Sequence, residues 1–197
     1  MINVTLPDGS QRQYEDGASP ADVAESISKS LAKAALAAKV NGELYDLNRP
    51  LEGDAEVAIV TARDEEGLEL IRHDAAHVLA QAVQELYPDT QVTIGPVIDD
   101  GFYYDFAREE PFSTEDFERI EKKMEEIVDK DYPIIREVWS KDDAIETFKK
   151  IGEDYKAQII DDIIPPGEPI TVYKQGDWFD LCRGPHLPST GKLPKAF

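Results

Sequence analysis

The sequence predicts an α+β protein with two domains, and three observations carry this prediction. A hairpin, a helix and further strands follow one another within the first sixty or so positions. A long helix then begins after Asp64, and beyond it helices alternate with short strands that end at turn residues. The length of 197 residues is long for one compact domain and short for three.

The first domain has the pattern of a β-grasp, or ubiquitin-like, fold. The chain turns at Pro7-Asp8-Gly9 between two strands, and Ser19 followed by Pro20 marks the start of a helix. Asn41-Gly42 predicts a tight turn between two later strands. The expected strands are 2–6, 12–14, 37–40, 44–45 and 57–60. We therefore expect a β-grasp domain over residues 1–63.

The second domain, residues 64–197, is expected to pack helices against an antiparallel sheet. Its long helix runs from Glu65 to about Tyr87 and is ended by Pro88. An apolar stripe along that helix is formed by Leu68, Ile71, Ala75, Val78, Leu79, Ala82 and Leu86. The other expected elements are a hairpin over 92–98 and 102–106, helices over 114–131, after Ser140 and at 155–160, a strand over 132–139 and two strands within 170–183.

Composition limits where the protein acts and what it binds. The net charge is −20, from 41 acidic and 21 basic residues, so the chain as a whole repels nucleic acid and any such role needs a local site. A single cysteine fits a reducing compartment. No targeting segment opens the sequence, and no run approaches the roughly 20 apolar residues of a membrane span. We expect a cytoplasmic protein with no membrane partner.

The histidines and the cysteine form two matching pairs. His73 and His77 lie four residues apart on one face of the long helix, away from its apolar stripe. The third histidine, His186, follows the cysteine, Cys182, at the same spacing. Two interpretations are open for these four residues. Imidazoles and a thiolate suit a tetrahedral zinc ion, and they equally suit a metal-free pocket that binds an ester and activates water.

Several segments carry a resemblance to a known family. The opening segments VTLPDGS and SPADVA resemble the TGS domain of bacterial threonyl-tRNA synthetases. Four later segments resemble the editing domain of those enzymes, namely RHDAAHVLAQAVQELYP, IGPVIDDGFYYDF, GEDYKAQII and FDLCRGPHLPSTGKL. The resemblance implies proofreading, in which serine is hydrolysed from mischarged tRNA(Thr). A second pocket serves this purpose because one methyl group discriminates by only about 1 to 3 kcal/mol.

The resemblance also implies the residues that do the chemistry. His73 and Lys156 are expected to activate water or to stabilise the transition state. Asp180 is expected to anchor the substrate ammonium. Cys182 is assigned to substrate binding, because so labile an ester needs no covalent intermediate.

The remaining expected site residues bind the substrate. His77 and His186 are expected to contact the terminal adenosine or the ester. Tyr104, together with the backbone at Gly95, is expected to form the wall that rejects the methyl group of threonine. The tRNA(Thr) acceptor end carrying serine is therefore the expected partner.

The resemblance implies no metal in the editing pocket. A zinc-dependent hydrolase that uses His73, His77, Cys182 and His186 is the alternative, because the editing domain of alanyl-tRNA synthetases holds zinc with such a set. A non-catalytic interaction module is a third hypothesis. The match stops at Phe197, which implies a fragment with a truncated editing domain. The ATP-dependent synthetic domain, with its ATP, Mg and zinc, is expected to be absent, as is any cofactor. The family forms homodimers through other regions, so we expect a monomer.

Overall fold

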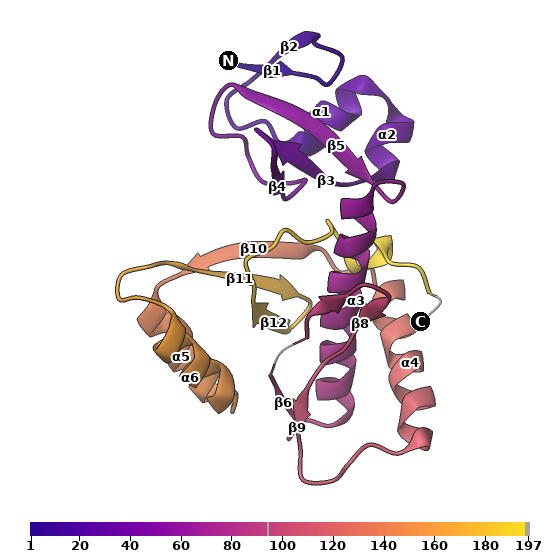
Figure 1. Cartoon of the computed structure of the whole chain (residues 1–197), viewed down its shortest axis with the longest axis vertical. Coiled ribbons are helices and arrows are strands. Elements are labelled where there is room, and N and C mark those ends of the chain that lie inside the picture. Colours follow the sequence, from indigo (N-terminus) through magenta and orange to yellow (C-terminus); the bar gives the residue numbers. More distant parts are fainter. Residues whose placement is uncertain (94, 196–197) are drawn as a thin grey trace. The chain divides into compact units, whose positions relative to one another are not determined.

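The computed structural model describes residues 1–93 and 95–195 (Figure 1). These residues form two compact units. The first comprises Met1–Ile71 and Gly184–Pro188, and the second comprises Arg72–Arg183 and the residues from Ser189 onward. The expected boundary between residues 63 and 64 stays a prediction. Among the described residues, no helix has both the length and the apolar character needed to cross a membrane.

The first unit has a five-stranded sheet in the order β2-β1-β5-β3-β4. Strands β1 and β5 are parallel, and the other neighbours are antiparallel. This mixed sheet with its helices confirms the predicted β-grasp fold. The elements are β1 (Ile2–Thr5), β2 (Gln11–Tyr14), α1 (Pro20–Ile27), α2 (Lys29–Ala34), β3 (Ala35–Val40), β4 (Glu43–Tyr45) and β5 (Ala55–Thr61).

Local signals fix the elements of this unit. Helix α1 begins with Pro20 after the N-cap residue Ser19, whose backbone N–H donates to the Asp22 carboxylate at 2.8 Å. Asn41 and Gly42 both have left-handed φ values, 52° and 84°, which a tight hairpin between β3 and β4 requires. The core lies between the sheet and α1 and includes Ile2, Val4, Leu6, Val23, Ala38, Leu51 and Val57.

The second unit combines helices with an antiparallel sheet, as predicted. Its sheet has the order β10-β11-β12. Two short ladders, β6 with β9 and β7 with β8, accompany it. The elements are α3 (Glu65–Leu86), β6 (Gln91–Val92), β7 (Val97–Ile98), β8 (Gly101–Phe102), β9 (Phe106–Ala107), α4 (Thr114–Asp129), β10 (Ile134–Trp139), α5 (Lys141–Lys150), α6 (Asp154–Ile163), β11 (Ile170–Gln175), β12 (Trp178–Leu181) and the 3-10 turn Thr190–Lys192.

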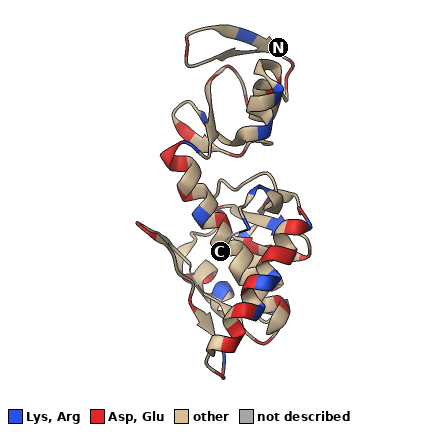
Figure 2. Cartoon of the chain, turned by 90° about the vertical axis from the view of Figure 1, so that its right-hand side faces the viewer, with Lys and Arg blue, Asp and Glu red and all other residues tan. Residues whose placement is uncertain are grey.

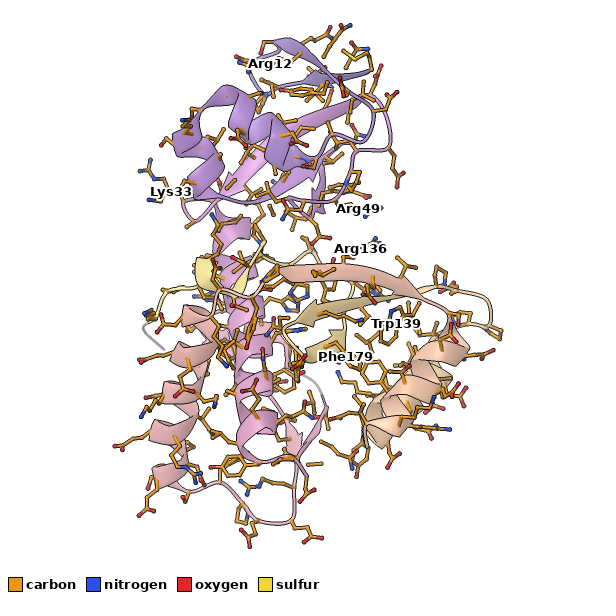
Figure 3. All side chains as sticks on the ribbon, turned by 180° about the vertical axis from the view of Figure 1, so that it is seen from behind. Arg12, Lys33, Arg49, Arg136, Trp139 and Phe179 are labelled. Carbon is orange, nitrogen blue, oxygen red and sulfur yellow. The ribbon has the colours of Figure 1, made fainter. Side chains whose placement is uncertain are left out.

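Helices α5 and α6 cover one face of the β10-β11-β12 sheet. Phe148 of α5 and Ile160 of α6 are buried with Ile170 and Val172 of β11. Figure 3 shows the labelled rings of Trp139 and Phe179 close to these helices, and the ring centroids of this pair lie 5.4 Å apart. Burial of this apolar cluster holds α6 against β12. Acidic residues are spread over both units rather than gathered on one (Figure 2).

Two details of the region predicted as the second domain, residues 64–197, differ from the prediction. Leu68, placed on the apolar stripe of α3, is 45% exposed, while the polar residues His77 and Gln81 are buried. The middle of α3 is buried around its whole circumference, so a single stripe does not describe it. The expected hairpin over 92–106 is divided into two short ladders. Pro96, which has no N–H to donate, lies between them, and Ile94 is outside the described residues.

The Asp116 carboxylate, in the first turn of α4, is expected to make the stability of the fold depend on pH. The Ser113 backbone N–H donates to Asp116 at 2.8 Å, and the Tyr87 hydroxyl donates to the same carboxylate. These bonds lower the pKa of Asp116 from 3.8 to about 2. A lowered pKa contributes stability that is present above pH 3.8 and is lost as the pH falls toward 2.

We therefore expect Asp116→Asn to lower the urea unfolding midpoint at pH 7 and to lower it less as the pH falls below about 4. The exposed Glu118 on the same helix provides the control variant Glu118→Gln. A difference between wild type and Asp116→Asn that stays constant from pH 7 to pH 2.5 would contradict this assignment.

Candidate active site

Helix α3 and the end of β12 bring two histidines and the cysteine together. His73 and His77 lie one helical turn apart, with ring centroids 4.9 Å from each other. Nε2 of His73 lies 3.1 Å from Sγ of Cys182, which directly follows β12. One ligand atom from each of these three residues lies within 4.8 Å of the others. Such a group is suited to binding a polar ligand, a water molecule or a zinc ion.

Lys156 and Asp180 form a buried ion pair beside this group. Nζ of Lys156, on α6, lies 3.1 Å from Oδ2 of Asp180, on β12. The side chains are 7% and 4% exposed, so water screens the pair little. The Tyr104 hydroxyl donates to the same Oδ2 at 3.2 Å, and the Leu181 backbone N–H donates to Oδ1 at 2.8 Å. The carboxylate is therefore held on both of its oxygens.

Tyr104 is a hydrogen-bond donor in this site. Burial raises its pKa, and the negative charge of the hydrogen-bonded Asp180 raises it further. Its ring lies directly against the backbone of Gly95, because a Cβ built on Gly95 would lie 2.1 Å from Cδ2 of Tyr104. Phe106 stacks on the tyrosine with ring centroids 5.0 Å apart. The structure thus joins the two residues that the sequence assigns to one wall.

A cavity of about 440 Å³ opens beside the ion pair. Lys156 and Asp180 line it, together with residues of α3, β6, α5 and the segment before Val92. This volume lies within the range of small-molecule sites, about 300 to 1,000 Å³. The buried lysine and aspartate therefore face a space that can hold part of a substrate.

Seven of the eight predicted site residues lie in the second unit. The exception is His186, whose loop, Gly184–Pro188, groups with the first unit. Its side chain is buried, and its backbone N–H donates to the Asp46 carboxylate at 3.0 Å. The geometry of the second-unit site therefore rests on the other seven residues.

Sequence reasoning missed three further residues around the cavity. Glu153 is buried, and burial raises its pKa. Its carboxylate accepts hydrogen bonds from the Gln84 side chain and, at 3.1 Å, from the Val92 backbone N–H. Gln84 in turn accepts a bond from Trp178. Glu153 lies in GEDYKAQII, one of the segments that carry the resemblance, but nothing in its local sequence indicates a buried partner.

Comparison with known domain families defines the class of protein. Residues 2–61 match the TGS domain family. Residues 170–197 match the family described as the threonyl and alanyl tRNA synthetase second additional domain. The chain therefore joins a TGS domain to a domain found in aminoacyl-tRNA synthetases.

The most similar proteins compared are synthetases of one specificity. The threonine–tRNA ligase of Hyphomonas neptunium is 83% identical over all 197 residues, which correspond to 30% of that protein. Those of Thiobacillus denitrificans and Maricaulis maris are 66% and 67% identical over the whole chain, which covers 31% and 30% of their lengths. The chain thus spans about three tenths of these relatives. The chain is thus similar, over its whole length, to the amino-terminal region of bacterial threonine–tRNA ligases.

Proposed function

We propose that the second unit edits mischarged tRNA(Thr) by hydrolysing the ester that joins serine to the terminal ribose. The observation that carries this proposal is the buried Lys156–Asp180 pair, which lines a cavity. Asp180 lies two residues before Cys182, whose sulfur is 3.1 Å from Nε2 of His73. A buried ammonium and a histidine provide a positive donor and a base within one site. The match of residues 170–197 to a synthetase additional domain supports an aminoacyl-tRNA substrate.

The ion pair indicates how Lys156 acts. Loss of its proton would leave the Asp180 carboxylate buried without a counter-charge, which is costly. Lys156 is therefore better suited to donate to the developing oxyanion than to act as the base. His73 takes the role of the group that positions the attacking water and accepts its proton. The water oxygen bonds to the ester carbon, the bond to the ribose oxygen breaks, and that oxygen takes up a proton.

Asp180 retains room for the ammonium of the substrate. A carboxylate has about four acceptor positions. Lys156, Tyr104 and the Leu181 backbone N–H occupy three of them. Among the contacts of the described residues this leaves one position on Oδ1, and we assign it to the ammonium of serine, beside the wall formed by Tyr104 and Gly95.

The proposed partner is the acceptor end of tRNA(Thr) carrying serine. The net charge of −20 opposes tRNA binding, so contacts close to the cavity must provide the affinity. His77 and His186 are proposed to contact the terminal adenosine or the ester. The cytoplasm is the proposed compartment, because charged tRNA is used there. A monomer is the proposed state of this chain.

A zinc-dependent hydrolase is the second candidate. It is favoured by the ligand atoms of His73, His77 and Cys182, which lie within 4.8 Å of one another and fit the nitrogen and sulfur preference of zinc. Zinc bound there would act as a Lewis acid on the ester carbonyl. Metal analysis of protein purified without a histidine tag separates the two candidates. Stoichiometric zinc, with activity lost to a chelator and restored by the ion, would replace the metal-free proposal.

The proposal is tested by comparing hydrolysis of seryl-tRNA(Thr) and threonyl-tRNA(Thr) by the 197-residue chain. We expect serine to be released much faster than threonine. Equal rates for both substrates would contradict selective editing. Hydrolysis of seryl-tRNA(Thr) by the chain that is absent in His73→Ala would exclude the non-catalytic interaction module.

The wall at Gly95 yields a specific prediction. A methyl group on Gly95 would overlap the Tyr104 ring, so Gly95→Ala must displace the ring and weaken its bond to Asp180. We expect seryl-tRNA hydrolysis to fall about tenfold or more, because small displacements in a site have large effects on rate. Gly101→Ala in the same region is the control, since a Cβ there meets nothing within 4 Å. Equal rates for the two variants would show that Tyr104 does not shape the pocket.

A further inference from the structure

Glu153 occupies the N-cap position of α6 but does not cap that helix. Glutamate is not among the preferred N-cap residues, and its side chain makes no cap hydrogen bond here. The side chain is buried instead, and its carboxylate reaches two other elements. It accepts from Gln84 of α3 and from the backbone N–H of Val92 of β6. Burying a carboxylate is costly, so this placement needs a reason beyond the start of α6.

The carboxylate determines which way the Gln84 amide points. Nε2 of Gln84 donates to Glu153 and, at 3.0 Å, to the carbonyl oxygen of Thr90. An ionised carboxylate and a backbone carbonyl only accept, so the NH₂ end of the amide must face them. The oxygen end is thereby turned toward Trp178, whose indole Nε1–H donates to it at 2.7 Å. An indole N–H can only donate, so all three partners agree on one orientation.

Trp178 connects this network to the proposed chemistry. Its side chain lines the cavity together with Lys156 and Asp180. Its ring meets the His77 ring edge-on, with centroids 5.5 Å apart and an interplanar angle of 88°. Trp178 and Asp180 are two residues apart on β12 and so point to the same side of the strand. The indole therefore lies beside the cavity, in contact with a histidine of the site.

We propose that Glu153 is a positioning residue of the editing pocket. Through Gln84 it holds the indole of Trp178, and through that ring it holds His77, in the arrangement that ester hydrolysis requires. It acts without touching the substrate. This inference rests on the proposed function, but the positions of the side chains can be measured separately from activity.

The proposal is tested by the single variant Glu153→Gln and then by exchanging the side chains of Glu153 and Gln84. In Glu153→Gln, the single amide oxygen can accept from Gln84 or from Val92, and its NH₂ group opposes the other donor. We expect the indole N–H signal of Trp178 in ¹⁵N NMR spectra to shift or broaden. We expect kcat for seryl-tRNA to fall on the order of 10²-fold with a smaller change in KM, because the pocket is misplaced rather than blocked.

The double variant Glu153→Gln with Gln84→Glu restores the pattern of donors and acceptors. The amide introduced at position 153 is then able to donate to the carboxylate introduced at position 84 and to accept from Val92, while that carboxylate accepts from Trp178. The exception is the Thr90 carbonyl, which loses its donor and faces a carboxylate oxygen instead. We expect the indole signal to return toward its wild-type position and kcat to recover to within about tenfold of wild type. Gln84→Glu alone places two carboxylates together and should be as impaired as Glu153→Gln.

Two control variants make the outcomes distinct. Glu125→Gln, at an exposed position on α4, should change neither readout. Trp178→Phe identifies the indole signal. If Glu153→Gln fails to fold by circular dichroism, the double variant still tests whether the exchanged pair restores the arrangement.

The proposal is overturned if Glu153→Gln leaves both the indole signal and kcat unchanged, or if the double variant is no better than Glu153→Gln. If no chain hydrolyses seryl-tRNA, yet the indole signal moves and returns as expected, the proposed function fails and the positioning by Glu153 stands.

Discussion

Changing His73 to alanine is expected to lower the rate of seryl-tRNA hydrolysis by about 10² to 10⁴, the usual contribution of a positioned acid or base. The imidazole lies on α3 with Nε2 3.1 Å from the sulfur of Cys182, which is two residues from Asp180 of the buried ion pair. Its removal takes away the group that positions water without disturbing the buried ion pair. The measurement is release of serine from charged tRNA with enzyme in excess over substrate.

The same assay distinguishes roles within the site. Glu69→Ala, an exposed change on α3, is the control and should leave the rate unchanged. Lys156→Ala is expected to slow the same step. The rate of hydrolysis in the double variant His73→Ala with Lys156→Ala should therefore fall by much less than the product of the two single reductions. Cys182→Ala should reduce the rate of hydrolysis less than His73→Ala does. A seryl-enzyme adduct in wild type that is absent in Cys182→Ala would establish a covalent mechanism instead.

Changing Lys156 to alanine is expected to lower the free energy of unfolding of the second unit by about 3 to 5 kcal/mol. The reason is that Asp180, 3% exposed, would be left buried without its counter-charge. Urea unfolding followed by circular dichroism measures this loss. Replacing both partners by apolar residues, as in Lys156→Met with Asp180→Leu, should restore most of the stability while leaving hydrolysis abolished.

An exposed ion pair in the same unit provides the matched control. Lys150 and Glu146 lie one turn apart on α5, with side chains 70% and 65% exposed. Lys150→Ala should change the free energy of unfolding by about 0.5 kcal/mol or less, since water screens such pairs. If Lys156→Ala lowers the free energy of unfolding no more than Lys150→Ala does, the buried pair does not stabilise the fold.

Elements with strong local signals could be predicted from the sequence. The Ser19-Pro20 start of α1, the Asn41-Gly42 turn and the end of α3 before Pro88 are each set by neighbouring residues, and the structure has them there. Helix α2 (Lys29–Ala34) was not predicted, because its six residues are too few to show a helical period and none of them is buried. The expected hairpin over 92–106 is divided at Pro96, whose effect on strand pairing the alternating pattern alone does not show.

The sequence indicates which residues form the candidate site but not which of them contact one another. Three histidines and one cysteine at matching spacings single out His73, His77 and Cys182. The pairing of Lys156 with Asp180 depends on how α6 packs against β12, a tertiary arrangement with no local signal. Glu153 was missed for the same reason, since its partners lie on α3 and β6, more than sixty residues earlier in the chain.

The two tryptophans lie in different surroundings, so the intrinsic fluorescence of one of them can report on the cavity. Trp139 lies among the rings of Phe148 and Phe179, whereas Trp178 lines the cavity. In a Trp139→Phe chain all indole fluorescence would come from the cavity. A ligand that displaces water from that ring would shift its emission toward the blue. Binding in the cavity could then be followed by the fluorescence of Trp178. The chain for this measurement would also carry His73→Ala, so that the bound ester is hydrolysed too slowly to be consumed.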